Sequence, residues 1–162
     1  MTTYAAPRKG FTLTEVLVTA AILAILAGAI LPLAKIAVQR EHEIELRRSL
    51  RLMREAIDIY KKMADEKKIE IESDTDGYPP DLETLVKGVK LKSESKDQKG
   101  GSDRIIKFLR RVPRDPMTNS TEWGCLSSQD APDAQSWGEQ NLFDVYTKSR
   151  AKALDGTRYR DW

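Results

Sequence analysis

The chain has 162 residues, which suits one globular domain with an appended segment. Charged residues make up 32% and hydrophobic residues 40%, and the formal net charge is +2. Apart from Arg8 and Lys9 the charges balance, which argues against a nucleic-acid-binding surface. The lone cysteine, Cys125, excludes an internal disulfide, and the lone histidine, His42, argues against a zinc site or a Ser-His-Asp triad.

Residues 16–34 form an apolar run without any charge. About 20 apolar helical residues cross the hydrocarbon core of a bilayer. A buried core helix is the alternative, but a soluble domain of this size rarely hides a helix that is apolar on every side. Arg8 and Lys9 precede the run, so the positive-inside tendency predicts a cytoplasmic N-terminus.

Three residues at the start of the run suggest processing and assembly. A secretory signal loses its apolar core on cleavage, whereas cleavage after the small residue Gly10 would leave that core on a mature chain beginning at Phe11. Glu15 is an acid at the edge of the span, which costs about 2–3 kcal/mol and favours pairing. It could neutralise the new α-amino group of a neighbouring subunit. The alternative is an interfacial glutamate whose carboxylate stays in water.

The stretch R-K-G-F-T-L-T-E-V-L-V, with the apolar run behind it, resembles the class III leader and N-terminal helix of type IV pilins and type II secretion pseudopilins. The resemblance implies that a prepilin peptidase cuts after Gly10 and N-methylates Phe11, and that Glu15 supports filament assembly. The family also has a proline where Pro32 stands. A helical proline lacks an N–H and presses on the carbonyl four residues back, here at Gly28. The helix could therefore kink or partly melt at this point.

The helix is expected to continue beyond the apolar run. An amphipathic stripe at helical spacing comprises Leu46, Leu50, Met53, Ile57, Tyr60 and Ala64. We predict one helix from residue 11 to about residue 66, roughly 80 Å long at about 1.5 Å per residue. Its second half would carry a globular domain, with a coiled coil as the alternative.

The rest of the chain predicts short elements between turns. Residues 74–77 read as a turn, and residues 81–88 as a short helix with proline before it and glycine at its end. The polar residues 92–102 predict an exposed loop. The alternating, aromatic-rich segments near residues 123–126 and 141–146 predict short strands. Three tryptophans are expected to pack in the core rather than bind a ligand: Trp123, Trp137 and Trp162.

Several of these segments extend the resemblance. L-R-x-M-R-E-A-I-D-x-Y, G-Y-P-P-D-L-E-T-L-V, F-L-R-R-V-P-R-D-P-M-T, F-D-V-Y and L-D-G-T-x-Y-x-D-W are similar to the major pseudopilin of type II secretion. Type IV pilins often close a C-terminal loop with a disulfide, which Cys125 alone cannot form, so the pseudopilin is favoured. The resemblance implies an α+β, pilin-like fold with a long N-terminal helix on a small antiparallel sheet. It divides the chain into a leader (residues 1–10), a transmembrane and filament-core helix (11–35) and a periplasmic domain (36–162).

The resemblance also raises the question of calcium, which many major pseudopilins bind in a C-terminal loop. The matching region, residues 147–161, offers Ser149, Asp155 and Asp161 as candidate ligands. Calcium wants six to eight oxygens, usually including several acids. The same region also holds five cations: Lys148, Arg150, Lys152, Arg158 and Arg160. The alternative is that Asp155 and Gly156 form a turn while Asp161 makes a surface ion pair.

We therefore expect a structural subunit without enzymatic activity, which assembles from the bacterial inner membrane into a periplasmic pseudopilus that drives protein export. The implied partners are copies of itself, prepilin peptidase, minor pseudopilins, membrane lipid and an inner-membrane assembly platform. ATP would be used by a separate cytoplasmic ATPase, because the chain has no Walker A sequence. No nucleic acid is expected. Two alternatives stay open: a type IV pilin of surface fibres for adhesion or twitching, and a single-pass anchored enzyme or binding protein.

Overall fold

The structure is a computed structural model. It describes residues 10–71, 75–92, 104–131, 133–134 and 136–162. The chain divides into two compact units, residues 1–40 and residues 41–162. Most of the predicted polar loop 92–102 and Asp74 of the predicted turn lie outside the described residues.

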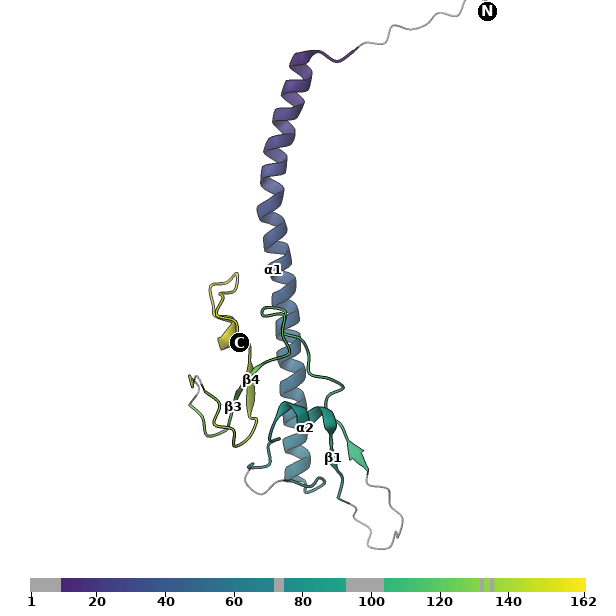
Figure 1. Cartoon of the computed structure of the whole chain (residues 1–162), viewed down its shortest axis with the longest axis vertical. Coiled ribbons are helices and arrows are strands. Elements are labelled where there is room, and N and C mark those ends of the chain that lie inside the picture. The colour runs from purple at the N-terminus through teal and green to yellow at the C-terminus, as the bar shows by residue number, and fades with distance from the viewer. Residues whose placement is uncertain (1–9, 72–74, 93–103, 132, 135) are drawn as a thin grey trace, which may run out of the picture. The chain divides into compact units, whose positions relative to one another are not determined.

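One helix, α1 (Leu13–Asp65), accounts for most of the regular structure (Figure 1). The predicted helix of residues 11–66 is thus confirmed to within two residues at each end. Its C-terminus is closed by Lys67, which has a φ of 57°. The Lys67 amide donates to Ala64 O at 2.9 Å and the Lys68 amide donates to Met63 O at 3.0 Å. This pair of bonds satisfies carbonyls that the last helical turn leaves open.

Within the first unit, α1 continues through Pro32 as a helix. Proline has no amide to offer to the carbonyl of Gly28, so the helix lacks one backbone bond at this level. A Cβ at Gly28 would meet nothing within 4 Å, so no side chain braces the helix there. Local melting at Pro32 in an assembled state stays a prediction.

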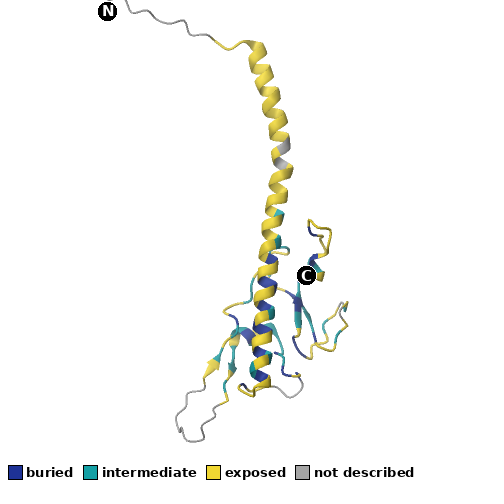
Figure 2. Cartoon of the chain, turned by 180° about the vertical axis from the view of Figure 1, so that it is seen from behind, coloured by how far each residue is buried: buried dark blue, intermediate teal, exposed yellow. Residues whose placement is uncertain are grey.

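The core of the second unit forms along the second half of α1. Buried residues recur there at helical spacing (Figure 2). They are the six residues of the predicted stripe, together with Ala56 and Ser49. From elsewhere in the unit, Leu85, Leu142 and Val145 join this core. Apolar residues buried at intervals of three and four hold one face of a helix against its domain, as the sequence pattern predicts.

The short helix α2 (Leu82–Lys87) agrees with the prediction for residues 81–88. Asp81 caps its start, accepting from the Thr84 amide at 2.7 Å and the Thr84 hydroxyl at 2.8 Å. Gly88 ends it with a φ of 86°, a conformation that favours glycine. A Cβ at Gly88 would also overlap the carbonyl oxygen of Ile106.

The strands form two antiparallel pairs instead of the single small sheet that was expected. Strand β1 (Val89–Lys90) pairs with β2 (Ile105–Ile106), and β3 (Gly124–Leu126) pairs with β4 (Asp144–Tyr146). The strands are only two or three residues long. A 3₁₀ turn, η1 (Tyr159–Asp161), follows near the C-terminus. The predicted α+β class is confirmed.

The three tryptophans differ in burial. Trp123 is a core residue, as predicted, and its indole N–H donates to Pro113 O at 2.9 Å. Trp137 and Trp162 are half-buried, with Trp162 packed against the core, and their indole N–H groups donate to Asn141 O at 2.8 Å and Thr157 Oγ1 at 2.7 Å. An indole that keeps one edge near solvent and bonds through its N–H is common where a loop covers a core.

Candidate functional site

Gly10 stands directly before α1, and the packing of this chain does not require a glycine there. A Cβ at Gly10 would meet nothing within 4 Å, and its φ lies outside the left-handed region. Phe11 is 83% exposed. Neither the free volume around Gly10 nor its backbone conformation requires a small residue within the described chain. Recognition by another molecule is the remaining reason for a glycine here. The leader, residues 1–9, lies outside the described residues.

The first turn of α1 is capped. Thr12 Oγ1 accepts from the Glu15 amide at 3.3 Å, and Thr12 O accepts from the Val16 amide at 3.2 Å. Thr12 is therefore the N-cap, and Glu15 stands at the third helical position, the spacing of a capping box. An acid in the first turn also interacts favourably with the helix dipole. The Thr-x-x-Glu spacing, which the sequence analysis did not use, could have shown this.

The Glu15 side chain is exposed. Among the residues that the structure describes, no cation pairs with its carboxylate. The carboxylate is therefore available to a group outside the described chain. The predicted pairing with the amine of Phe11 in a second subunit stays a prediction.

Among the residues that the structure describes, none covers the apolar run on α1. Every residue from Leu13 to Gly28 is exposed, and the most apolar 18-residue window of the helix has none of its residues buried. The helix is long and apolar enough to cross a membrane. Such a surface needs lipid or neighbouring helices around it. Together with the capped start, this indicates membrane anchoring.

The three candidate calcium ligands each have a local role in the C-terminal segment, residues 147–162. Ser149 Oγ accepts from the Ala151 amide at 3.3 Å. Asp155 Oδ1 accepts from the amide of Thr157 at 2.9 Å and from its hydroxyl at 2.6 Å, which closes the expected turn at Gly156. These bonds lower the pKa of Asp155, with a smaller contribution from the charge of Arg47. Asp161 is exposed within η1.

This donor set does not fit calcium. Within the described ranges, no three His, Cys, Asp or Glu side chains form a group that could hold a metal ion. The second oxygen of Asp155 lies 3.9 Å from the Arg47 guanidinium. The segment has only two carboxylates among five Lys and Arg residues, whereas calcium sites usually include several acids.

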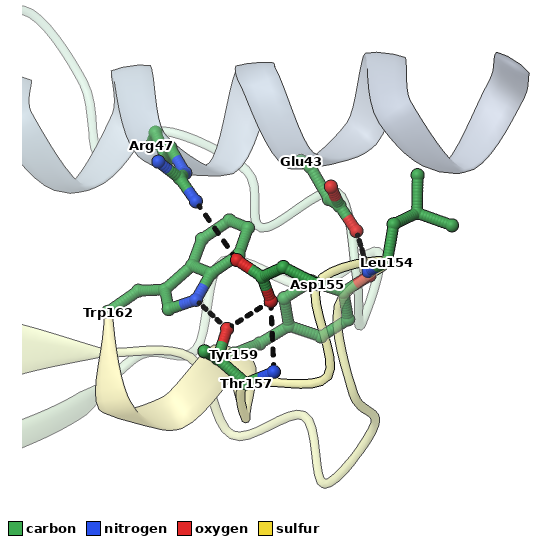
Figure 3. A network of polar contacts seen from close by, with 7 residues as sticks. All are labelled: Glu43, Arg47, Leu154, Asp155, Thr157, Tyr159 and Trp162. Atoms are coloured by element: carbon green, nitrogen blue, oxygen red, sulfur yellow. Dashed lines mark hydrogen bonds and ion pairs between the residues drawn. The ribbon is translucent and has the colours of Figure 1, made fainter. Parts of the chain in front are cut away.

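Helix α1 instead supplies the groups that hold the C-terminal segment (Figure 3). Glu43 Oε1 accepts from the Leu154 amide at 2.8 Å and from the Tyr159 hydroxyl at 2.9 Å. Arg47 Cζ lies 4.0 Å from the centroid of the Trp162 ring, a cation–π arrangement.

Arg54 continues the same face of α1 and binds strand β4. It donates to both carboxylate oxygens of Asp144, at 2.6 and 3.2 Å. It also donates to Val145 O at 3.2 Å and to Trp162 O at 2.7 Å. Residues 43, 47 and 54 are spaced four and seven apart, so helical periodicity alone shows that they share a face. The sequence gives no sign of what they contact.

A second polar centre holds the turn after residue 114. Asp115 is fully buried and accepts from the Met117 amide at 2.8 Å, the Thr118 hydroxyl at 3.0 Å and the Thr147 hydroxyl at 2.5 Å. These bonds satisfy a carboxylate that burial would otherwise destabilise. The Asp-Pro pair marks the turn in the sequence, but the contact with Thr147 required the tertiary structure.

Cys125 on β3 has the chemistry of a structural cysteine. Burial raises the pKa of its thiol to about 11, with the charge of Lys148 opposing the shift. A thiol with this pKa is almost fully protonated near neutral pH and is a poor nucleophile.

Residues 6–31 match the family model described as the prokaryotic N-terminal methylation motif. No curated protein and no solved structure matches the chain. The matched residues contain Gly10, Phe11 and Glu15, together with most of the uncovered apolar run. The motif is a type IV pilin-like signal and does not distinguish pilins from pseudopilins.

Proposed function

We propose that this chain is a structural subunit of a type II secretion pseudopilus. The observation that carries the proposal is the methylation motif at residues 6–31, which leads directly into an apolar helix without cover in the chain. A filament core of bundled helices would supply that cover. The second unit, with its own buried core along α1, would form the globular part of each subunit.

The proposed route begins in the bacterial inner membrane. Residues 1–10 form the leader on the cytoplasmic side, residues 11–35 span the bilayer, and residues 36–162 form the periplasmic domain. Prepilin peptidase removes the leader after Gly10 and methylates the new N-terminus at Phe11. The exposure of both residues supports access by such an enzyme.

During assembly the apolar helix would leave the lipid and pack against the apolar helices of other subunits. An assembly platform, minor pseudopilins and a separate cytoplasmic ATPase would drive this step. The unpaired carboxylate of Glu15 would meet the amine of Phe11 in a neighbouring subunit, because two opposite charges in an apolar core stabilise each other most when they touch. Pro32 would let the helix yield during the transfer. The chain's role is structural rather than catalytic, in line with its motif.

A pseudopilus is favoured over a surface pilus for two reasons. The segments around residues 50–60, 108–118 and 154–162 resemble major pseudopilins. The C-terminal segment is held to α1 by Glu43 and Arg47 rather than by a disulfide, and the one cysteine lies on β3.

Mass spectrometry of the mature N-terminus, isolated from the native host, tests the proposed processing. We expect a chain that begins with N-methylated Phe11. Gly10→Val should leave the leader in place, because a branched side chain then stands beside the bond to be cut. Gly28→Ala adds a methyl group at an equally open glycine within α1 and should be cleaved normally. Mature chains beginning at Phe11 in Gly10→Val would overturn the leader assignment.

A deletion strain tests the choice of filament. We expect the strain to retain proteins in the periplasm that the parent strain secretes. We also expect electron microscopy of the parent to find no long surface fibres that contain this chain. Normal secretion together with the loss of surface fibres would assign the chain to a type IV pilus instead.

A further inference from the structure

We propose that side chains of α1 fasten the C-terminal segment, residues 147–162, and that calcium has no part in its folding. We call this arrangement the C-terminal clasp. It consists of Glu43 and Arg47 on α1 with Leu154, Asp155, Tyr159 and Trp162 (Figure 3). All of these residues belong to the second unit. The inference is independent of filament formation.

Glu43 makes the tightest contacts of the clasp. One carboxylate oxygen accepts from the backbone at Leu154 and from the hydroxyl of Tyr159, at 2.8 and 2.9 Å. Both donors are neutral and the acceptor is charged, which shortens and strengthens such bonds. The Tyr159 ring is buried, so this contact fixes both the chain and an aromatic core residue. A carboxylate from α1 thus holds the backbone at Leu154 and the Tyr159 side chain in place.

Arg47 brings a fixed positive charge to the same place. Its guanidinium lies over the Trp162 ring and 3.9 Å from Asp155 Oδ2. The Trp162 ring packs edge-on against Tyr159 at 5.1 Å between centroids, and its N–H donates to Thr157. The ion pair is exposed and contributes little by itself. The stacked ring makes Arg47 part of the packing, so its removal disturbs Trp162 and the turn together.

The charges around the clasp oppose a divalent cation. Residues 147–161 carry five Lys and Arg residues against Asp155 and Asp161, and Arg47 adds a further positive charge from α1. Asp155 Oδ1 already accepts two hydrogen bonds from Thr157. A calcium ion would have to displace these bonds and the guanidinium while facing a net positive segment.

Thermal unfolding of the full chain in detergent micelles tests the clasp. The parent is measured in excess calcium and in excess EDTA, followed by Glu43→Ala and Arg47→Ala in both conditions. The matched controls are Glu45→Ala and Arg48→Ala, which remove exposed side chains without an ion pair among the described residues of the same helix. Each pair makes the same substitution in one helix, so helix propensity cancels.

We expect the parent to unfold at the same temperature with calcium and with EDTA. Glu43→Ala and Arg47→Ala should each lower that temperature by about 3 °C or more relative to their controls. Tyr159→Phe, which removes only the hydroxyl, should shift it in the same direction. Equilibrium dialysis with calcium up to about 1 mM, the range of weak extracellular sites, should show no saturable binding.

Two results would overturn the inference. One is a parent that calcium stabilises, with the effect abolished by Asp155→Asn. The other is that Glu43→Ala and Arg47→Ala unfold at the temperatures of their controls, which would leave the segment held by other contacts. Failure of leader cleavage or of filament formation would count against the proposed function alone, because neither enters this measurement.

Discussion

At the residue scale, Glu15 has two roles that the structure separates. Its amide takes part in the cap of α1 through Thr12, which is a property of the single chain. Its carboxylate is exposed and has no cation among the described residues, which points to a partner. Gly10 likewise has no packing role in the described chain, because a Cβ added there would have no atom within 4 Å. The structure of the described chain therefore gives no packing role to the Gly10 position or to the Glu15 carboxylate.

Glu15→Ala should be cleaved normally after Gly10 but should assemble poorly, because the amine of Phe11 then has no carboxylate to meet in the filament core. Electron microscopy and filament yield in the native host measure the effect, and Glu15→Asp should retain part of it. Thr12→Ala removes the cap hydroxyl and keeps Glu15. If Thr12→Ala impairs assembly as strongly as Glu15→Ala, helix capping rather than charge pairing explains the role of Glu15.

The thiol of Cys125 should react slowly and with a marked pH dependence. Burial raises its pKa from an ordinary value of 9.0 to about 11, so less thiolate is present at any pH below that value. At pH 8 the folded protein should react with a thiol reagent about 100-fold more slowly than protein unfolded in guanidinium, and the rate should rise as pH approaches 11. Equal rates at pH 8 would mean that β3 opens readily.

At the element scale, the two halves of α1 show how one helix can serve two environments. In the second half, one face of the helix is buried and the opposite face is exposed. The buried face forms the core with Leu85, Leu142 and Val145. The first half is apolar all around and finds no cover in the chain. The short helix α2 depends instead on its ends, since six residues hold few backbone hydrogen bonds of their own.

Removing the cap of α2 should therefore be measurable. Asp81→Ala removes the acceptor of the Thr84 amide and should reduce the free energy of unfolding by about 1 kcal/mol. Asp81→Asn keeps an oxygen acceptor and should cost only a small part of this. Urea unfolding of the full chain in detergent micelles compares the three proteins. Equal midpoints for all of them would show that tertiary contacts rather than the cap fix α2.

At the scale of the whole molecule, the second unit is held together by contacts from α1 to segments far along the chain. Arg54 binds Asp144 across 90 residues, and Glu43 binds Leu154 across 111 residues. Asp115 reaches Thr147 across 32 residues in the same manner. The short strands contribute little by comparison, since each pair has only two or three residues per strand. Side-chain hydrogen bonds and ion pairs, rather than a larger sheet, thus join the distant segments of this unit.

Arg54→Leu should lower the free energy of unfolding by about 1–2 kcal/mol, because it leaves Asp144 and two backbone carbonyls without a donor. Arg51→Leu is the matched control, since Arg51 is exposed on the same helix. Chemical denaturation of the full chain measures the difference between the two variants. Equal stability would show that solvent replaces the bonds of Arg54 without cost.

The sequence by itself determined the features that depend on neighbours along the chain. The apolar run, the buried stripe of α1 and the ends of α2 follow from residue spacing, because helical geometry brings residues three and four apart together. The motif around Gly10 and Phe11 is local in the same sense. For this reason the α+β class and the processing segment could be predicted without a structure.

Only the tertiary structure decided how the C-terminal segment is held. Ser149, Asp155 and Asp161 were chosen by residue type, and the structure gives Ser149 and Asp155 local hydrogen bonds and places Asp161 on an exposed turn. Glu43, Arg47 and Arg54 read as solvated helix charges because their partners lie about 100 residues away. Whether a charge meets solvent or a distant backbone group depends on the packing of the whole unit, which spacing along the chain does not encode.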